Sequence, residues 1–192
     1  ELISKKKDIE LKTGKKINLV AVSAKNPNKK RKFKINRKIF FKNPLEIFNK
    51  KKIDILFEAI GLSDGISKKV VETALKNNIH VITPNKALIS KHGNYLAKLA
   101  ENNNVNLEFE ASVAGGIPIL RSIKEGLTTN KISKVYGILN GTSNYILSEM
   151  ENSNENFLDV LKKAQKLGYA EPGNPKLDLN GFDAFAKVRI LS

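Results

Sequence analysis

Short apolar runs alternate with amphipathic segments over roughly the first 125 residues. The apolar runs are rich in β-branched residues and predict strands at residues 17–24, 53–60, 80–83 and 105–110. Helical spacing predicts helices at residues 66–77 and 84–101, the second begun by Pro84, and a short helix from about Pro118. Strands that alternate with helices predict an α/β fold with a doubly wound parallel sheet. The nearly continuous apolar run at residues 17–24 predicts a strand buried on both faces.

The pattern changes after about Thr128, where a second domain is predicted to begin. Residues 132–139 alternate as a strand, and Asn140-Gly141-Thr142 then starts a helix. A further helix at residues 157–167 ends at Gly168. Its apolar side is predicted to carry Phe157, Leu158, Leu161, Ala164 and Leu167. We therefore divide the chain into residues 1–127 and residues 128–192.

Four charged residues lie in and after a loop broken by glycine and proline, which runs into an apolar helix at residues 182–191. They are Glu171, Asp178, Asp183 and Lys187. Asp183 and Lys187 are four positions apart, so on a helix they share one face and can touch. This spacing fits a solvated surface pair, and it also fits a site for a polar substrate.

Composition restricts the classes of function. The chain has 34 Lys and Arg against 19 Asp and Glu, a net charge of +15, and its densest basic run spans residues 25–42. No recognition motif accompanies that run, so we do not expect nucleic-acid binding to be the function. The absence of cysteine excludes disulfides and cysteine metal sites. No apolar run approaches the roughly 18 residues of a membrane span, and no signal peptide is recognised, so we expect a cytoplasmic protein.

Candidate ligand contacts follow the predicted strands. In parallel α/β sheets ligands bind beyond the carboxyl ends of the strands, where Gly61, Asn85, Lys86 and Glu110 are expected. Lys86 is placed in the first turn of a helix, where a cation opposes the helix dipole unless an anion pairs with it. It either reaches solvent or contacts a ligand. The glycine-rich G-x-G-x-x-G turn of dinucleotide-binding folds does not occur in the sequence.

Four sequence blocks occur in one order along the chain. They are VITPNKAL at residues 81–88, EASVAGGIPI at 110–119, GILNGTSNYIL at 137–147, and the segment at 168–187 with Gly-Tyr-Ala-Glu followed by Asp-x-x-x-Lys. Together they resemble the signature of the homoserine dehydrogenases. The resemblance implies a Rossmann-like NAD(P)-binding domain at residues 1–127, with residues 1 to about 13 as the tail of its first helix. It also implies that residues 128–192 begin a mixed αβ domain for substrate binding and dimerisation, and that the protein forms a homodimer.

The resemblance also implies a reaction and roles for individual residues. The reaction is the reversible reduction of L-aspartate 4-semialdehyde to L-homoserine by NAD(P)H, on the route to threonine, methionine and isoleucine. The implied catalytic residues are Lys187 and Asp183; the implied substrate contacts are Glu171, Asp178 and Thr142; the implied cofactor contacts are Gly61, Lys86 and Gly168. Thr142 has an equally good alternative role as a helix N-cap. One departure from the family pattern is an extra position between Glu171 and Asp178.

The loop after residues 17–24 bears on the choice of cofactor. It is basic, beginning with Lys25, where an NAD-specific site usually offers a carboxylate. A cation there suits the 2′-phosphate of NADP, so we predict NADP over NAD. The alternative is a solvated loop.

The block at residues 110–119 offers only oxygen ligands. They are a carboxylate oxygen of Glu110 and the backbone carbonyls of Val113, Gly115 and Ile117. An all-oxygen set suits a hard cation, and the resemblance implies a sodium-type site. The alternative is a tight turn in which Glu110 caps the following helix.

Two other classes of function stay open. One is a different NAD(P)-dependent oxidoreductase that uses the same loop for another small molecule. The other is a basic nucleic-acid-binding or regulatory protein.

Overall fold

The computed structural model describes residues 2–31, 35–170 and 179–192. The first half contains α1 (Lys6–Thr13), β1 (Val22–Ser23), η1 (Arg37–Ile39), β2 (Phe40–Phe41), α2 (Glu46–Lys50), β3 (Ile55–Phe57), α3 (Ile66–Lys76), β4 (His80–Ile82) and α4 (Lys86–Asn102). The second contains β5 (Leu107–Glu108), η2 (Glu110–Ser112), α5 (Ile119–Arg121), the π-helical η3 (Ser122–Gly126), α6 (Gly141–Ser153), α7 (Phe157–Leu167) and α9 (Phe182–Leu191). None of these helices combines the length and the apolar composition that a membrane span needs.

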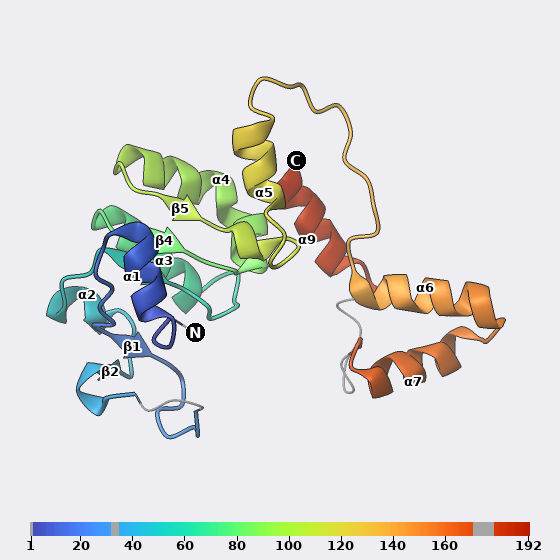
Figure 1. Cartoon of the computed structure of the whole chain (residues 1–192), viewed down its shortest axis with the longest axis horizontal. Coiled ribbons are helices and arrows are strands. Elements are labelled where there is room, and N and C mark those ends of the chain that lie inside the picture. Colours follow the sequence, from blue (N-terminus) through green and yellow to red (C-terminus); the bar gives the residue numbers. More distant parts are fainter. Residues whose placement is uncertain (1, 32–34, 171–178) are drawn as a thin grey trace.

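A three-stranded parallel sheet in the order β3-β4-β5 forms the centre of the molecule (Figure 1). Leu56 pairs with Val81, and Val81 pairs with Leu107. Helix α3 connects the first two strands and α4 connects the next two, so both crossovers run between neighbouring parallel strands. The predicted α/β class with parallel strands is confirmed.

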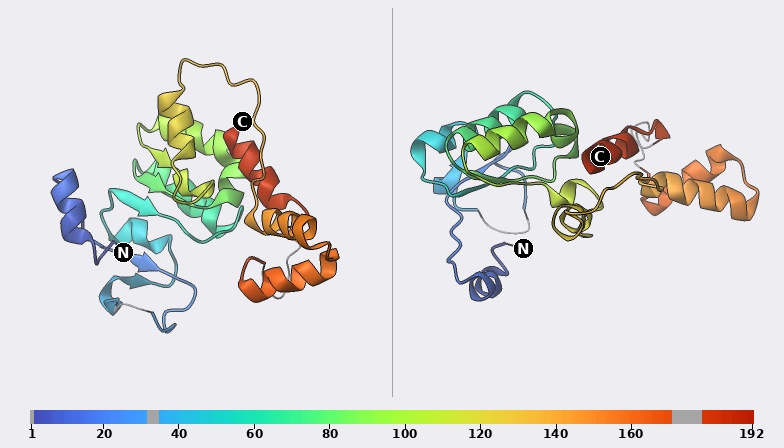
Figure 2. Two further views of the ribbon diagram at one scale, coloured as in Figure 1. Left: turned by 45° about the vertical axis from the view of Figure 1, so that its right-hand side comes forward. Right: turned by 90° about the horizontal axis from the view of Figure 1, so that it is seen from above.

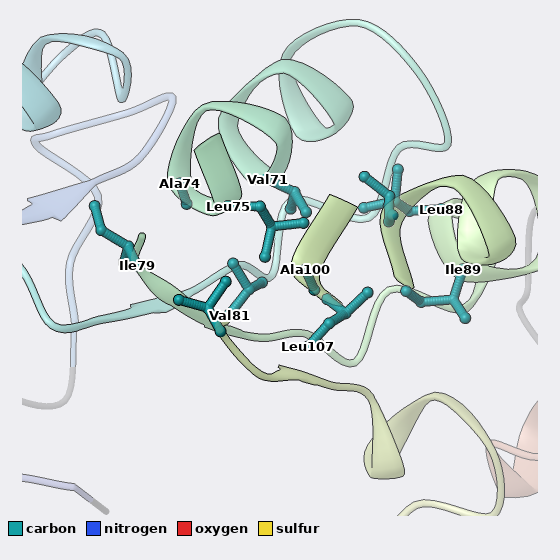
Figure 3. Close-up of a cluster of buried hydrophobic side chains, with 11 residues drawn as sticks. Val71, Ala74, Leu75, Ile79, Val81, Leu88, Ile89, Ala100 and Leu107 are labelled. Carbon is teal, nitrogen blue, oxygen red and sulfur yellow. The ribbon is translucent and has the colours of Figure 1, made fainter. Parts of the chain in front are cut away.

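The main hydrophobic core lies between this sheet and the helices α3 and α4 (Figure 3). Its fully buried side chains include Val71 and Leu75 of α3, Val81 of β4, and Leu88 and Leu96 of α4. These positions recur at three- and four-residue intervals along each helix, which gives each helix one apolar face. The core therefore follows from the periodicity seen in the sequence.

A second, two-stranded parallel sheet pairs β1 with β2, and it corrects one prediction. Only residues 22–23 of the predicted strand at 17–24 are strand, and none of those eight residues is buried. In the described part of the chain β1 pairs only with β2, and both residues of β1 are half-buried, so the strand is not enclosed on both faces. Figure 2 shows this small sheet and α1 standing beside the main sheet, and no residue of α1 is buried. The apolar run correctly predicted a strand, but the prediction that both faces of this strand are buried was wrong.

The predicted helices of the first half are found within a few residues of their expected bounds. Helix α3 begins one residue after Gly65, which has a φ of 64°. Helix α4 begins at Lys86, with the side chain of Asn85 accepting a hydrogen bond from the backbone N–H of Leu88. The helix thus begins two residues after the predicted Pro84, because the amide oxygen of Asn85 satisfies a free N–H of the first turn and makes Asn85 the N-cap.

The second half of the chain contains a helical hairpin and lacks one predicted strand. Helices α6 and α7 pack together around Ile146, Val160, Ala164 and Ala170, and α7 ends at Gly168 as predicted. The predicted strand at residues 132–139 is absent: this segment is irregular, is exposed except at the half-buried Leu139, and is unpaired within the described residues. Alternation alone cannot make a strand, which needs a neighbour for its backbone hydrogen bonds.

The buried face of α7 also differs from the prediction. Val160 and Ala164 are completely buried, whereas Phe157, Leu158 and Leu167 are 40%, 64% and 63% exposed. Of the five residues predicted on the apolar side, Ala164 is buried and Leu161 packs partly against this cluster. Helix α9 packs separately, against α4, and its Ile190 contacts the main core.

Candidate active site

A cavity of about 460 Å³ opens at the carboxyl edge of the three-stranded sheet. Its lining residues follow β3, β4 and β5 and are joined by one residue of α9: Gly61, Pro84, Asn85, Lys86, Ala87, Ala111, Ser112, Ala114, Gly115 and Lys187. Three parallel strands thus deliver their following loops to one place, as expected for this type of sheet. The predicted residues Gly61, Lys86, Gly115 and Lys187 are all in this lining.

Asp183 links three separate elements beside the cavity. Its Oδ1 accepts a hydrogen bond from Nζ of Lys86 at the start of α4. Its Oδ2 accepts from Nδ2 of Asn140 at 3.0 Å and pairs with Nζ of Lys187 at 2.7 Å. Lys86 therefore has the anionic partner that its position at a helix N-terminus calls for. The Asp183–Lys187 spacing seen in the sequence is confirmed as a direct contact.

Two oxygen atoms of described residues hold Lys187 in place. Its Nζ lies 2.7 Å from Oδ2 of Asp183 and donates to the backbone carbonyl of Leu139 at 2.6 Å. The side chain is 20% exposed and lines the cavity. An ammonium group in this position can stabilise a developing negative charge on a ligand oxygen or donate a proton to it.

Asn140 was not predicted as a site residue, although its turn was singled out. Its side-chain oxygen accepts from the backbone N–H of Ser143 and so caps α6, while its amide nitrogen contacts Asp183. The sequence Asn-Gly-Thr before a helix signals the cap. The contact with Asp183 has no local signal, because Asp183 lies 43 positions away.

Thr142 is not the N-cap of α6, and its predicted contact with the substrate stays a prediction. It is 5% exposed, and its hydroxyl donates to the backbone carbonyl of Tyr169. The ring of Tyr169 stacks on that of Tyr145 with centroids 4.7 Å apart. These contacts join the turn after α7 to α6, and the cap of α6 is Asn140.

Two predicted cofactor residues lie outside the cavity lining. Gly168 ends α7 with a φ of 82°, a left-handed conformation that glycine adopts without a steric penalty. Lys25 is exposed in the loop after β1. The predicted substrate residues Glu171 and Asp178 lie outside the described residues.

Glu110 caps the helix that follows it. Its two carboxylate oxygens accept from the backbone N–H groups of Leu120 and Arg121 at 3.0 and 2.9 Å. The turn between them has left-handed residues at Ala114 and Gly115, with φ values of 57° and 58°. The described part of the chain contains no cluster of three or more His, Cys, Asp or Glu side chains suited to a metal. The capping geometry foreseen as one alternative is present.

A parallel sheet with its cavity beyond the strand ends, lined by loop glycines and lysines, defines an α/β protein of the dinucleotide-binding class. A family model described as homoserine dehydrogenase, NAD binding domain, matches residues 3–110, and one described as homoserine dehydrogenase matches residues 118–192. The chain belongs to the homoserine dehydrogenase family, and residues 3–110 correspond to its NAD-binding domain.

Individual relatives agree with this assignment. The homoserine dehydrogenase of Neisseria gonorrhoeae is 48% identical over 153 residues, which are 80% of this chain and 35% of that protein. A crystal structure of a homoserine dehydrogenase from Thiobacillus denitrificans has a TM-score of 0.85 and 39% identity, over 99% of this chain and 43% of that one. A hyperthermophilic archaeal homoserine dehydrogenase in complex with NADPH has a TM-score of 0.72 and 26% identity, over 98% and 53% of the two chains. The chain thus spans about a third to a half of the length of these relatives.

Proposed function

We propose that this chain provides the cofactor-binding part and the beginning of the substrate-binding part of a homoserine dehydrogenase. The reaction is the reversible reduction of L-aspartate 4-semialdehyde to L-homoserine with NAD(P)H. The observation that carries the proposal is the position of Lys187, whose ammonium group lines the cavity while Asp183 and the carbonyl of Leu139 hold it. Residues 1–127 would form the cofactor domain, and residues 128–192 would begin the substrate and dimerisation domain.

Reduction of the aldehyde requires a positive group beside the aldehyde oxygen. A nicotinamide cofactor, when bound, would supply the hydride that the aldehyde carbon accepts. Negative charge then develops on the oxygen, and Nζ of Lys187 stabilises it and delivers the proton. Asp183 is the orienting partner, since its Oδ2 lies 2.7 Å from that nitrogen. Glu171 is proposed to bind the ammonium group of the substrate, with Asp178 in support and the turn at Thr142 near its carboxylate.

The cavity walls suit a dinucleotide. Gly61 has a φ of 89° and no Cβ, so a ligand can approach its backbone closely. Lys86 lines the same cavity, and its side chain is 32% exposed, so that it can contact an anionic ligand group as well as Asp183. We assign cofactor contacts to Gly61, Lys86, Gly168 and Lys25. The exposed, basic loop that begins at Lys25 supports NADP as the preferred cofactor; equal Michaelis constants for the two cofactors would contradict it.

A sodium-type cation is proposed at Glu110, Val113, Gly115 and Ile117. In the described part of the chain, no donor forms a hydrogen bond with the carbonyl oxygens of Val113 and Gly115. Each carboxylate oxygen of Glu110 accepts one hydrogen bond and keeps a second lone pair. The carbonyl of Ile117 accepts from the N–H of Ile119. These four oxygen ligands fit a monovalent cation that would stabilise the loop after β5.

The homodimer and the cytoplasmic location stay predictions from the family resemblance.

The test uses the protein with its complete natural chain and follows NADPH oxidation with L-aspartate 4-semialdehyde. We expect Lys187→Ala to lower turnover by at least roughly a hundredfold while the circular dichroism spectrum stays that of the folded protein. Lys162→Ala is the matched control, because Lys162 is an exposed lysine on α7 paired only with Asp159 among the described side chains. Near-normal turnover of the Lys187 variant would eliminate its role. A folded wild-type protein that binds NADPH but does not reduce the semialdehyde would point to another substrate for the same fold.

A further inference from the structure

Glu58 is a buried carboxylate that receives four hydrogen bonds directly after strand β3. It is 2% exposed. Its Oε1 accepts from the backbone N–H of Ile60 at 2.7 Å, from the hydroxyl of Ser67 at 3.2 Å and from the side-chain amide of Asn85 at 3.4 Å. Its Oε2 accepts from the hydroxyl of Thr83 at 2.6 Å. A carboxylate taken out of water needs hydrogen-bond donors around it, and all four of these groups donate to Glu58.

The direction of the two hydroxyl hydrogen bonds to Glu58 is fixed by a second bond at each hydroxyl. The hydroxyl of Ser67 accepts from the backbone N–H of Leu62 at 3.3 Å, and that of Thr83 accepts from the backbone N–H of Asn85 at 3.0 Å. A hydroxyl has one proton to give, so both protons point at Glu58. A glutamine in its place would present an NH₂ group to partners that already donate.

The same network ties together two walls of the cavity. Gly61 lies between Ile60, which donates to Glu58, and Leu62, which is held by Ser67. On the other wall, Asn85 donates to the carbonyl of Leu62 at 2.9 Å and places Lys86 at the start of α4. The separation between the Gly61 loop and the turn at Lys86 is therefore set through Glu58.

We propose that Glu58 is a positioning residue for the dinucleotide site, which it serves by fixing the Gly61 loop against the turn that presents Lys86. The inference rests on the proposed function, because it assumes that a dinucleotide occupies this cavity. Glu58 itself does not line the cavity, so its effect is transmitted through Ser67, Thr83 and Asn85.

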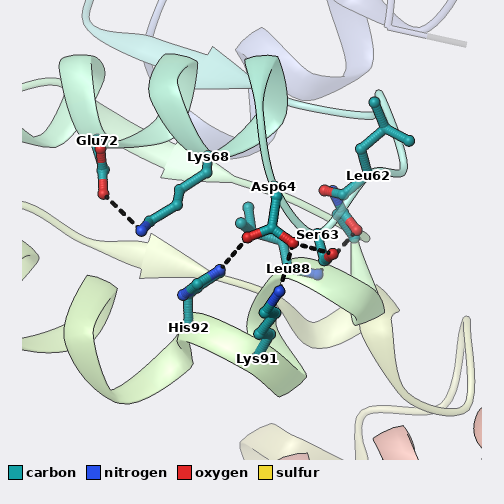
Figure 4. A network of polar contacts seen from close by, with 9 residues as sticks. Leu62, Ser63, Asp64, Lys68, Glu72, Leu88, Lys91 and His92 are labelled. Carbon is teal, nitrogen blue, oxygen red and sulfur yellow. Dashed lines mark hydrogen bonds and ion pairs between the residues drawn. The ribbon is translucent and has the colours of Figure 1, made fainter.

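The loop after β3 makes a second set of contacts, which does not involve Glu58. Asp64 accepts from Lys91 and contacts His92 on α4, and nearby on α3 Glu72 lies 3.6 Å from Lys68 (Figure 4). Glu72 is a glutamate on a neighbouring helix, outside the cavity lining and without a contact to Glu58. Glu72→Gln therefore makes the same chemical change without touching the network.

The experiment compares Glu58→Gln with Glu72→Gln in the protein with its complete natural chain. NADPH binding is measured by fluorescence titration, and steady-state kinetics give KM for NADPH and for L-aspartate 4-semialdehyde together with kcat. We expect Glu58→Gln to raise Kd and KM for NADPH roughly tenfold, with kcat at saturating NADPH and KM for the semialdehyde changed by less than about threefold. Glu72→Gln should leave all four values unchanged.

Unchanged NADPH affinity in folded Glu58→Gln, or the same loss in Glu72→Gln, would overturn the inference. If Glu58→Gln does not fold, Thr83→Val removes one donor while keeping a β-branched side chain, and it must then weaken NADPH binding or the inference fails. The titration does not depend on turnover. A wild-type protein that binds NADPH without reducing the semialdehyde would refute the proposed function and still allow the test of Glu58.

Discussion

Replacing Asp183 with asparagine tests the junction between α4, α6 and α9. The variant keeps the size of the side chain but removes its charge, and one of its two oxygens becomes an NH₂ group that cannot accept. Lys86 and Lys187 both interact with this carboxylate, Lys86 through Oδ1 and Lys187 through Oδ2. At least one ammonium group therefore loses its acceptor at position 183, and the two lysines keep their positive charges without the carboxylate of residue 183 between them.

The expected loss follows from the exposure of the three side chains. A hydrogen bond to a charged group contributes about 1.5–3 kcal/mol when it is well buried. Asp183, Lys187 and Lys86 are 13%, 20% and 32% exposed, so each bond is partly screened and the lower end applies. Asparagine retains one acceptor. We therefore expect a net loss of about 2 kcal/mol in the free energy of unfolding, which in a domain of this size lowers Tm by roughly 4–8 °C.

The assay is thermal unfolding followed by circular dichroism at neutral pH and low salt. Glu46→Gln is the control, because Glu46 pairs with Lys50 at 3.1 Å on the surface, where the side chains are 49% and 61% exposed. That change should cost less than about 0.5 kcal/mol. If Asp183→Asn were no more destabilising than Glu46→Gln, the junction would contribute little to stability and the reasoning would be wrong.

Two further predictions concern other parts of the molecule. Hydrogen bonds, chiefly from Lys91, hold the pKa of Asp64 well below its ordinary value of 3.8, so the folded state binds this proton more weakly than the unfolded chain. The resulting stabilisation is complete above about pH 5 and declines as the pH falls below 3.8. The difference in Tm between wild type and Asp64→Asn should therefore shrink in acid. A constant difference down to about pH 2 would contradict this prediction. Val160→Ala should lower the free energy of urea unfolding by about 2 kcal/mol because the side chain is completely buried. Leu158→Ala should change it by less than about 0.5 kcal/mol, since Leu158 is 64% exposed, and equal effects would refute the observed burial of α7.

The helices could be predicted from sequence better than the strands. Helix α7 ends where Gly168 predicts, because a helix forms its hydrogen bonds within one segment and its cap is local. A strand depends on a partner elsewhere in the chain. Residues 17–24 and 132–139 have equally good strand patterns, yet the first keeps two strand residues and the second has none. Nothing in either pattern specifies whether a neighbour is present.

The site was predictable where its signals are local. The contact between Asp183 and Lys187 was predictable from their spacing, and the position of Lys86 from its place after a strand, whereas their roles come from the family resemblance and stay predictions. The contact between Lys86 and Asp183 was not predictable, because it depends on α9 packing against α4. Glu58 was also missed, although a glutamate inside the apolar run IDILFEAI, three residues before a glycine, is the kind of interruption that marks a buried polar network.

The contact between Lys86 and Asp183 joins positions 97 residues apart, and this separation affects the order of folding. The sheet and its two crossover helices are built from contacts between segments that follow one another closely, so they can form early. The lysine at the start of α4 must wait until residues 182–191 have been synthesised and α9 has docked. Closing so long a loop costs chain entropy, and this cost is offset only when the contact between Lys86 and Asp183 forms. The cavity is therefore expected to assemble last during folding and to open first when the protein is destabilised, while the nucleotide-binding sheet remains intact.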